Sequence, residues 1–192
     1  MNKRFLLPIL IFCVGLCSAQ ESTGVYQERF EAIALKLWNN PELGYQETLS
    51  SELLKGILED EGFSIIGNLA AIPTAFRAVY GESGPTIGIL GEFDALPGLS
   101  QTNSPFQEKA SNPNGAGHAC GHHLFGAGSA WAAVMIKQWL IETKTPGRII
   151  FFGTPAEEGG SGKVYMAREG AFENVDIMLS LIHISEPTRR YA

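Results

Sequence analysis

Residues 85–90 (PTIGIL) decide the class of fold, because they form a continuously apolar run bounded by turn residues. A strand with one face in water alternates apolar and polar side chains, whereas an uninterrupted apolar run is expected where both faces of a sheet are covered. Residues 147–152 (GRIIFF) repeat the pattern further along the chain. We therefore predict two strands that are buried on both faces.

Helical patterns surround these strands. Apolar residues recur at helical spacing in residues 25–39 and 49–61, and residues 124–142 are rich in alanine and large apolar side chains. A shorter helix is expected over residues 162–169. Strands that alternate with helices predict an α/β domain with a mostly parallel sheet covered on both faces.

Shorter β-type runs complete the predicted sheet, at residues 63–66, 74–80 and 175–179. Residues 81–85 (GESGP) carry turn-forming glycines and a proline, so we predict a hairpin between residues 74–80 and 86–90. Residues 98–117 are rich in Gly, Pro, Ser and Asn without periodicity, which predicts a long loop. Loops of that length in compact domains are usually functional.

Composition and charge narrow the classes of function. The 192 residues are 45% hydrophobic and 18% charged, and their formal net charge is −6. This is the balance of an ordinary globular protein, and no cluster of lysine and arginine offers a surface for phosphates. We therefore expect no nucleic-acid partner.

The N-terminus has the pattern of an export signal. Lys3 and Arg4 precede an apolar stretch over residues 5–17, and small residues then lead to Ala19. The stretch is shorter than the roughly 20 residues that a membrane span needs. We expect residues 1–19 to be a signal peptide, the protein to be periplasmic or extracellular, and no stable membrane anchor to remain after cleavage.

Cleavage would leave Cys120 as the single cysteine of the mature chain, and a lone thiol in an oxidising compartment is expected to be occupied. Cys120 lies within residues 117–123 (GHACGHH), two positions before His122, so a turning backbone can direct both side chains at one centre. Thiolate and imidazole suit zinc and similar divalent ions. The alternative is a polar helix cap with a buried cysteine.

Two carboxylate-bearing segments follow the predicted buried strands, at the end of the strand where open α/β sheets assemble their sites. In residues 154–160 (TPAEEGG), Glu157 and Glu158 would point different ways on an extended chain, so that one could bind metal while the other takes a proton from water. In residues 91–98 (GEFDALPG), Asp94 could orient a metal-bound imidazole. Taken alone, each segment is also compatible with a solvated loop or a capped turn.

Together these motifs resemble the metal-dependent amidohydrolase branch of the aminoacylase/carboxypeptidase family. The motifs are, in chain order, residues 41–44 (PELG), 94–98 (DALPG), 118–122 (HACGH) and 157–159 (EEG). Residues 91–94 (GEFD) and 159–163 (GGSGK) are most similar to the p-aminobenzoyl-glutamate hydrolases of the large-subunit type. The resemblance covers residues 25–180.

The resemblance implies a zinc-peptidase-like α/β domain that carries two divalent metal ions, with a ferredoxin-like lid inserted further on. It implies that Cys120, His122 and Glu158 are metal ligands. It also implies catalytic roles for Glu157, as the general base that activates water, and for Asp94, as the orienting carboxylate. The donor set suits zinc or manganese.

The chain departs from the family in two ways. His123 stands where many relatives carry aspartate, and we do not assign it as a ligand. The family also needs further ligand histidines, one just past the last predicted strand. Residues 181–192 break the alternation of strands and helices and resemble a translated sequencing adapter, so we expect a non-native tail in which His183 is a coincidence. Residues 20–180 would then be the N-terminal part of the catalytic domain, truncated before the lid.

The sequence therefore predicts hydrolysis of the amide bond of an N-acyl or N-aroyl amino acid or a small peptide, similar to p-aminobenzoyl-glutamate. Without the lid and two ligands, this chain alone is expected to be inactive. The alternative is a non-catalytic metal- or peptide-binding protein on the same fold, and Glu157 favours the enzyme. A redox protein that uses Cys120 would lack a resolving cysteine. The full-length protein is expected to form a homodimer, because lids in this family often pair.

Overall fold

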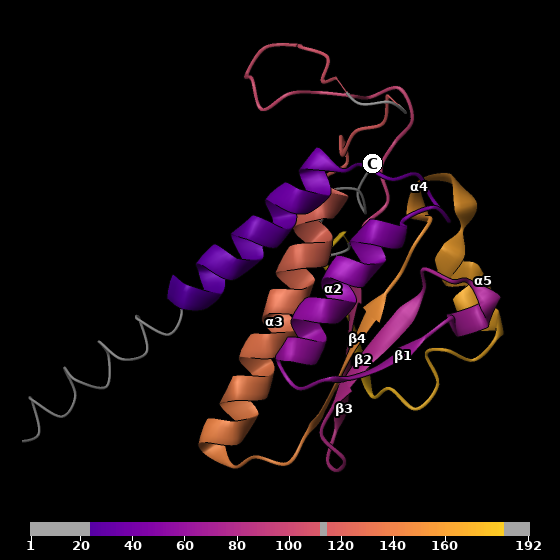
Figure 1. The fold of residues 1–192 in the computed structure, drawn as a ribbon. Helices are drawn as coiled ribbons and strands as arrows, with labels where there is room; N and C mark the ends of the chain where they lie inside the picture. The colour runs from indigo at the N-terminus through magenta and orange to yellow at the C-terminus, as the bar shows by residue number, and fades with distance from the viewer. Residues whose placement is uncertain (1–23, 112–114, 183–192) are drawn as a thin grey trace, which may run out of the picture.

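The computed structural model describes residues 24–111 and 115–182, which form one sheet packed between layers of helix (Figure 1). The strands are β1 (Ser64–Gly67), β2 (Phe76–Tyr80), β3 (Thr86–Gly91), β4 (Arg148–Gly153) and β5 (Ile177–Ser180). The predicted signal peptide, and the predicted tail from His183 onward, lie outside the described residues.

The five strands lie in the order β1-β2-β4-β3-β5. β3 is parallel to both β4 and β5, whereas β2 is antiparallel to β1 and β4. Four of the five strands therefore run in one direction and only β2 is reversed. The prediction of an α/β fold with a mostly parallel sheet is confirmed.

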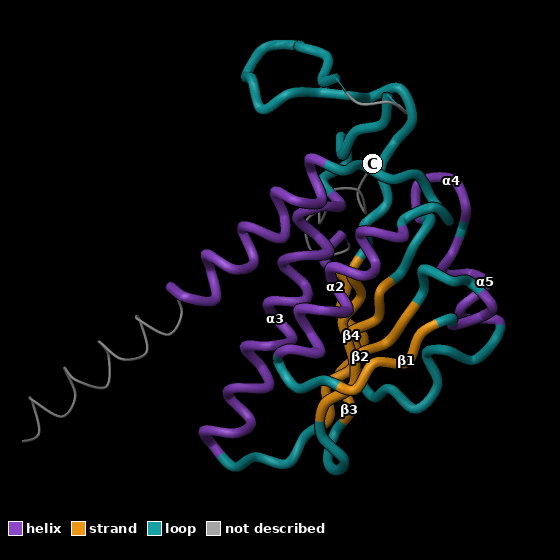
Figure 2. Tube along the Cα trace, in the orientation of Figure 1, coloured by secondary structure: helices purple, strands orange, loops and turns teal. Residues whose placement is uncertain are grey.

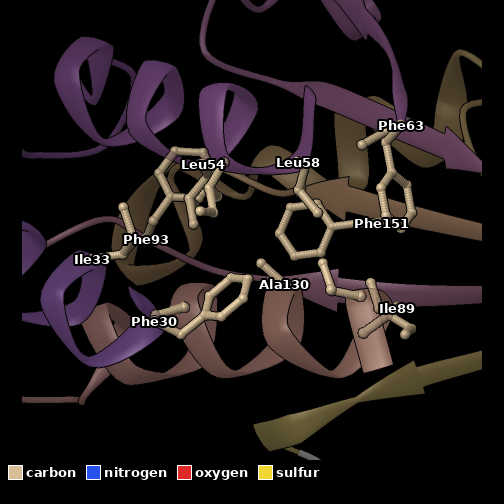
Figure 3. Packing of buried hydrophobic residues seen from close by; sticks show 14 of the residues in the cluster. Phe30, Ile33, Leu54, Leu58, Phe63, Ile89, Phe93, Ala130 and Phe151 are labelled. Carbon is tan, nitrogen blue, oxygen red and sulfur yellow. The ribbon is translucent and has the colours of Figure 1, made fainter. Parts of the chain in front are cut away.

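The main core lies between the sheet and three helices: the first helix (residues 24–39), α2 (Thr48–Asp60) and α3 (His122–Thr143). Figure 3 shows side chains from all three helices meeting those of the sheet, among them Phe30, Leu58 and Phe151. By length and composition α3 could cross a membrane, but it buries one side against the sheet, as the core helix of a globular domain does.

Successive residues of β4 serve opposite faces of the sheet. Phe151 belongs to the main core under the helices, whereas Ile150 and Phe152 belong to a second cluster on the other face, where Phe152 meets Phe172. α5 (Gly162–Arg168) lies on that second side (Figure 1). Burial on both faces explains why the strand carries no polar position after its first residue.

The predicted hairpin between β2 and β3 is wrong, because β4 lies between these two strands. Residues 81–85 do form a turn, but it crosses over the start of β4. A Cβ atom on Gly81 would lie 2.2 Å from the carbonyl oxygen of Gly147, and one on Gly84 would lie 2.6 Å from that of Pro146. Both glycines also have positive φ. The turn residues therefore serve close passage over a neighbouring strand.

Residues 98–111 and 115–117 contain no helix or strand and extend beyond the carboxyl ends of the strands, as predicted for a long loop (Figure 2). One short helix was not predicted: α4 (Glu157–Gly160), which follows β4 after three residues. It contains the adjacent glutamates that the sequence suggested would lie on extended chain.

Candidate metal centre

The register of the two central parallel strands brings the predicted site segments together. Gly91 of β3 pairs with Gly153 of β4. The chain leaves β3 toward Asp94 and leaves β4 toward Glu157 and Glu158, so these side chains share one end of the sheet. α3 begins at the same end, because its first residue is His122.

Three of the predicted residues converge on one point. One ligand atom from each of Cys120, His122 and Glu158 lies within 4.8 Å of the other two. Among the described residues no other group of three metal-binding side chains comes this close. The structure therefore brings together the three residues that the sequence predicted as metal ligands.

The atoms that face one another in this group suit a shared cation. Nε2 of His122 lies 3.9 Å from Oε1 of Glu158, and both atoms are buried without a hydrogen-bond partner among the described residues. Buried polar atoms rarely stay unpaired in proteins. Donor atoms that each lie about 2 Å from one metal ion are separated by roughly 3–4 Å. The residues present therefore fit a divalent metal ion.

Asp94 fixes the orientation of His122. Its Oδ1 lies 2.9 Å from Nδ1 of His122, and its Oδ2 accepts a hydrogen bond of 2.9 Å from the backbone N–H of Glu158. A carboxylate at Nδ1 holds the proton there, which leaves the lone pair on Nε2 directed at the ligand group. Asp94 thus connects the histidine and the glutamate of the group from behind.

The local charge favours a cation. Burial alone would raise the pKa of Asp94, but hydrogen bonds from His122 and from the backbone of Glu158 hold it below its usual range. The pKa of His122 is raised, because its hydrogen bond to Asp94 and the nearby carboxylates outweigh its burial. Partial burial of the thiol and the charges of Glu158 and Glu157 raise the pKa of Cys120 to about 11. A bound cation would offset this excess of negative charge.

Glu157 and Glu158 occupy the first turn of α4 rather than extended chain. Successive residues of a helix point about 100° apart, so the two carboxylates still diverge. Oε2 of Glu157 lies 3.7 Å from Nε2 of His122, and its side chain is 33% exposed, compared with 19% for Glu158. Glu157 is therefore beside the ligand group and more open to solvent.

The two remaining histidines of the cluster lie outside the ligand group. His118 is buried and its Nε2 donates to the backbone carbonyl of Leu37 at 3.1 Å. The ring of His123 packs against those of Trp38 and His118. Burial lowers the pKa of both histidines to about 4. Leaving His123 unassigned agrees with this position.

Two buried carboxylates near the site were missed. Glu92 is fully buried and forms an ion pair of 2.7 Å with Lys163, which joins the two segments GEFD and GGSGK that the sequence had singled out separately. Glu47 is also fully buried and binds the backbone that leads to Glu157. Its only sequence signal is its position shortly after the PELG motif.

Known proteins resemble this chain in sequence and in fold. The model of peptidase family M20/M25/M40 matches residues 88–191. A p-aminobenzoyl-glutamate hydrolase polypeptide from Escherichia coli (strain K12) is 43% identical over 154 residues, which are 80% of this chain and 32% of that protein. The Xaa-Arg dipeptidase of Mus musculus is 33% identical over 177 residues, 85% of this chain and 37% of that protein. A dinuclear metal-binding peptidase of known structure from Bacillus subtilis has a TM-score of 0.69 at 30% identity, covering 82% of this chain and 43% of that one. The chain spans about a third of the length of the curated relatives it matches.

Proposed function

Because the chain belongs to peptidase family M20/M25/M40, we propose that the intact protein hydrolyses the amide bond of an N-acyl or N-aroyl amino acid or a small peptide. The observation that carries the proposal is the position of Glu157. It places a free carboxylate 3.7 Å from the imidazole of a three-residue ligand group, and its side chain is partly exposed. A metal-storing or metal-sensing protein would need the ligands but not this neighbouring base.

Cys120, His122 and Glu158 would hold a divalent metal ion, and the intact protein would hold two such ions, zinc or manganese. When bound, divalent ions lower the pKa of water and polarise a carbonyl group. The dinuclear peptidase from Bacillus subtilis is a structural relative that supports two ions. The thiolate of Cys120 favours a softer ion such as zinc at this position.

The side chains divide the proton transfers. Glu157 takes a proton from the attacking water and then delivers it to the nitrogen of the leaving amine, so one carboxylate acts first as base and then as acid. Asp94 keeps the proton of His122 on Nδ1 throughout. Glu158 stays with the ligand group, because its backbone N–H is fixed on Asp94.

An open pocket of about 480 Å³ adjoins this centre and offers room for part of a substrate. Its wall includes Asp94 and Glu158 beside the apolar side chains of Leu43, Leu96 and Pro97. A mostly apolar wall next to a few polar groups is typical of small-molecule sites. The Escherichia coli relative is a p-aminobenzoyl-glutamate hydrolase, and we propose an amide of that kind, with an aromatic or acyl group on one side and an amino acid on the other.

Two single substitutions in the intact protein test this function. Glu158→Ala removes a metal ligand and should lower the metal content. Glu157→Ala should leave the metal content nearly unchanged and lower kcat for p-aminobenzoyl-glutamate by about 100-fold or more, because only proton transfer is lost. Metal analysis and hydrolysis are measured on the same samples. If Glu157→Ala loses metal and Glu158→Ala keeps it, the roles are reversed, and if both variants stay fully active the hydrolase proposal is wrong.

Export and assembly are further parts of the proposal. Residues 1–19 would direct the protein out of the cytoplasm, and the mature chain would begin at Gln20. N-terminal sequencing of the processed protein measures this directly, and retention of Met1 would contradict it. The intact protein would form a homodimer without nucleic-acid partners, which its mass in solution would reveal.

A further inference from the structure

The connector between the first helix and α2 touches both loops that carry the site. In residues 41–47, the backbone carbonyl of Glu42 accepts a hydrogen bond of 2.8 Å from the N–H of Ala95, next to Asp94. The hydroxyl of Tyr45 donates to the carbonyl of Gly160, at the end of α4. Gly44 allows the close approach, because a Cβ atom there would lie 2.9 Å from Ala156. The connector therefore spans the gap between the loop after β3 and the loop after β4.

Glu47 makes the most deeply buried of these contacts. Its carboxylate is 0% exposed, with Oε1 accepting from the backbone N–H of Ala156 at 2.8 Å and Oε2 accepting from the hydroxyl of Thr74 at 3.0 Å. Burial raises the pKa of this carboxyl group. Among the described residues no lysine or arginine forms an ion pair with it. A buried carboxylate held by neutral donors alone is costly for a fold, so its presence calls for a reason.

Glu47 is not used to cap its own helix. It occupies the N-cap position of α2, yet its side chain forms no capping hydrogen bond. Glu42 does the capping instead: its carboxylate accepts from the backbone N–H groups of Leu49 and Ser50, at 3.0 and 2.7 Å. The side chain of Glu47 is thereby left to reach across to Ala156.

Ala156 needs an external anchor. Its φ of +56° and ψ of +46° lie in the left-handed region, which is unfavourable for a residue with a Cβ atom. It is also the N-cap residue of α4 and directly precedes Glu157. A rotation at Ala156 would change the direction of the first turn of α4, and with it the positions of both glutamates.

We propose that Glu47 is a positioning residue of the metal centre, which fixes Glu157 and Glu158 by holding the backbone N–H of Ala156. This inference rests on the proposed function, because it assumes that the two glutamates serve a metal site. Thr74 holds the second oxygen of Glu47, and Ser51 in turn donates to the carbonyl of Thr74 at 2.9 Å. The anchor is therefore itself anchored in α2 and in the segment before β2.

A pair of substitutions isolates the hydrogen bond to Ala156. Glu47→Met keeps the approximate volume of the side chain and removes the acceptor, whereas Glu47→Gln keeps an amide oxygen that can accept from Ala156. Both changes remove the buried charge, so a difference between them reports the acceptor. Ser51→Ala is the matched control, because it deletes a buried hydrogen bond on the same helix without touching Ala156. Circular dichroism and thermal unfolding establish that each variant is folded.

Cobalt(II) titration of the intact protein gives a readout that does not depend on turnover. Coordination by the thiolate of Cys120 produces a cobalt–sulfur absorption band, and its growth yields the dissociation constant. We expect a dissociation constant 10- to 100-fold higher for Glu47→Met, as for loss of other groups that orient metal ligands. Glu47→Gln and Ser51→Ala should stay within about threefold of the wild type, and kcat should follow the same order.

The outcomes separate this inference from the proposed function. If wild-type protein neither binds cobalt through Cys120 nor hydrolyses the amide, the proposed function fails. If wild-type protein does both, and folded Glu47→Met binds cobalt as tightly as Glu47→Gln, the positioning role of Glu47 is refuted while the function stands. An equal loss in Ser51→Ala and Glu47→Met would refute it as well, because the effect would then be one of general packing.

Discussion

Replacing Asp94 with asparagine should disable the metal centre with almost no change in shape. In the wild type, one oxygen of Asp94 faces Nδ1 of His122 and the other faces the backbone N–H of Glu158, each at 2.9 Å. Asparagine offers one acceptor and one donor in the same two places. If its oxygen faces His122, its NH₂ group opposes the N–H of Glu158. If it flips, its NH₂ group forces Nδ1 to accept, so the proton moves to Nε2 and blocks the lone pair that would bind metal.

The size of the effect follows from these contacts. Asp94 is 1% exposed, so no water compensates for the mismatch. Losing one buried hydrogen bond to a charged acceptor costs about 1.5–3 kcal/mol. Since 1.4 kcal/mol corresponds to about tenfold in an equilibrium constant, we expect Asp94→Asn to weaken metal binding by roughly 10- to 100-fold, the usual range for a group that orients a ligand.

Isothermal titration of the metal-free protein with zinc measures this change. Asp176→Asn is the control, because Asp176 also accepts a hydrogen bond from a backbone N–H, that of Thr86 at 2.8 Å, at the opposite end of β3. The control should bind zinc as the wild type does. Wild-type zinc affinity in folded Asp94→Asn would refute the argument, and so would an equal loss of affinity in Asp176→Asn.

Three further changes have defined outcomes. Cys120→Ser should abolish the cobalt–sulfur absorption band and weaken metal binding, because a hydroxyl is a poorer donor than a thiolate for such ions; a retained band would contradict the assignment. Phe151→Ala should lower the free energy of unfolding by about 3–5 kcal/mol in urea, since Phe151 is fully buried, whereas Phe106→Ala, at a residue 78% exposed, should change it by less than about 0.5 kcal/mol. Burial raises the pKa of Glu47 above 4.5, so the stability that its protonated form contributes is complete below about pH 4.5 and is lost as pH rises through the raised pKa. Glu47→Gln does not titrate, so its free energy of unfolding relative to the wild type should increase between about pH 4.5 and pH 7, and a constant difference would contradict the raised pKa.

Much of the fold could be predicted because burial leaves a strong mark on the sequence. Residues 147–152 lack any polar position except at their start, and they form a central strand with both faces covered. Cys120, His122 and Glu158 could be predicted as a group because few chains place such donors after buried strands. Their convergence is now a structural observation, while their roles stay predictions.

The failures have physical reasons as well. A turn that closes a hairpin and a turn that passes over a third strand need the same residues, so residues 81–85 could not reveal that β4 lies between β2 and β3. The four residues of α4 are too few to show a helical period. Glu47 looks like an ordinary polar residue at a helix start, and only the three-dimensional structure shows that its side chain is directed at Ala156, far along the chain.

The position of β4 between β2 and β3 also constrains how the chain can fold as it leaves the ribosome. β1 and β2 can form their antiparallel pair early, because they are neighbours in sequence. β2 and β3 have no direct pairing, so the buried edge of each remains without its partner until residues 148–153 have been made. During that interval the nascent chain exposes the apolar faces of two strands, a state that invites misfolding and chaperone binding. Synonymous codons that slow translation between residues 91 and 148 should therefore lower the yield of native protein more than the same delay placed after residue 153.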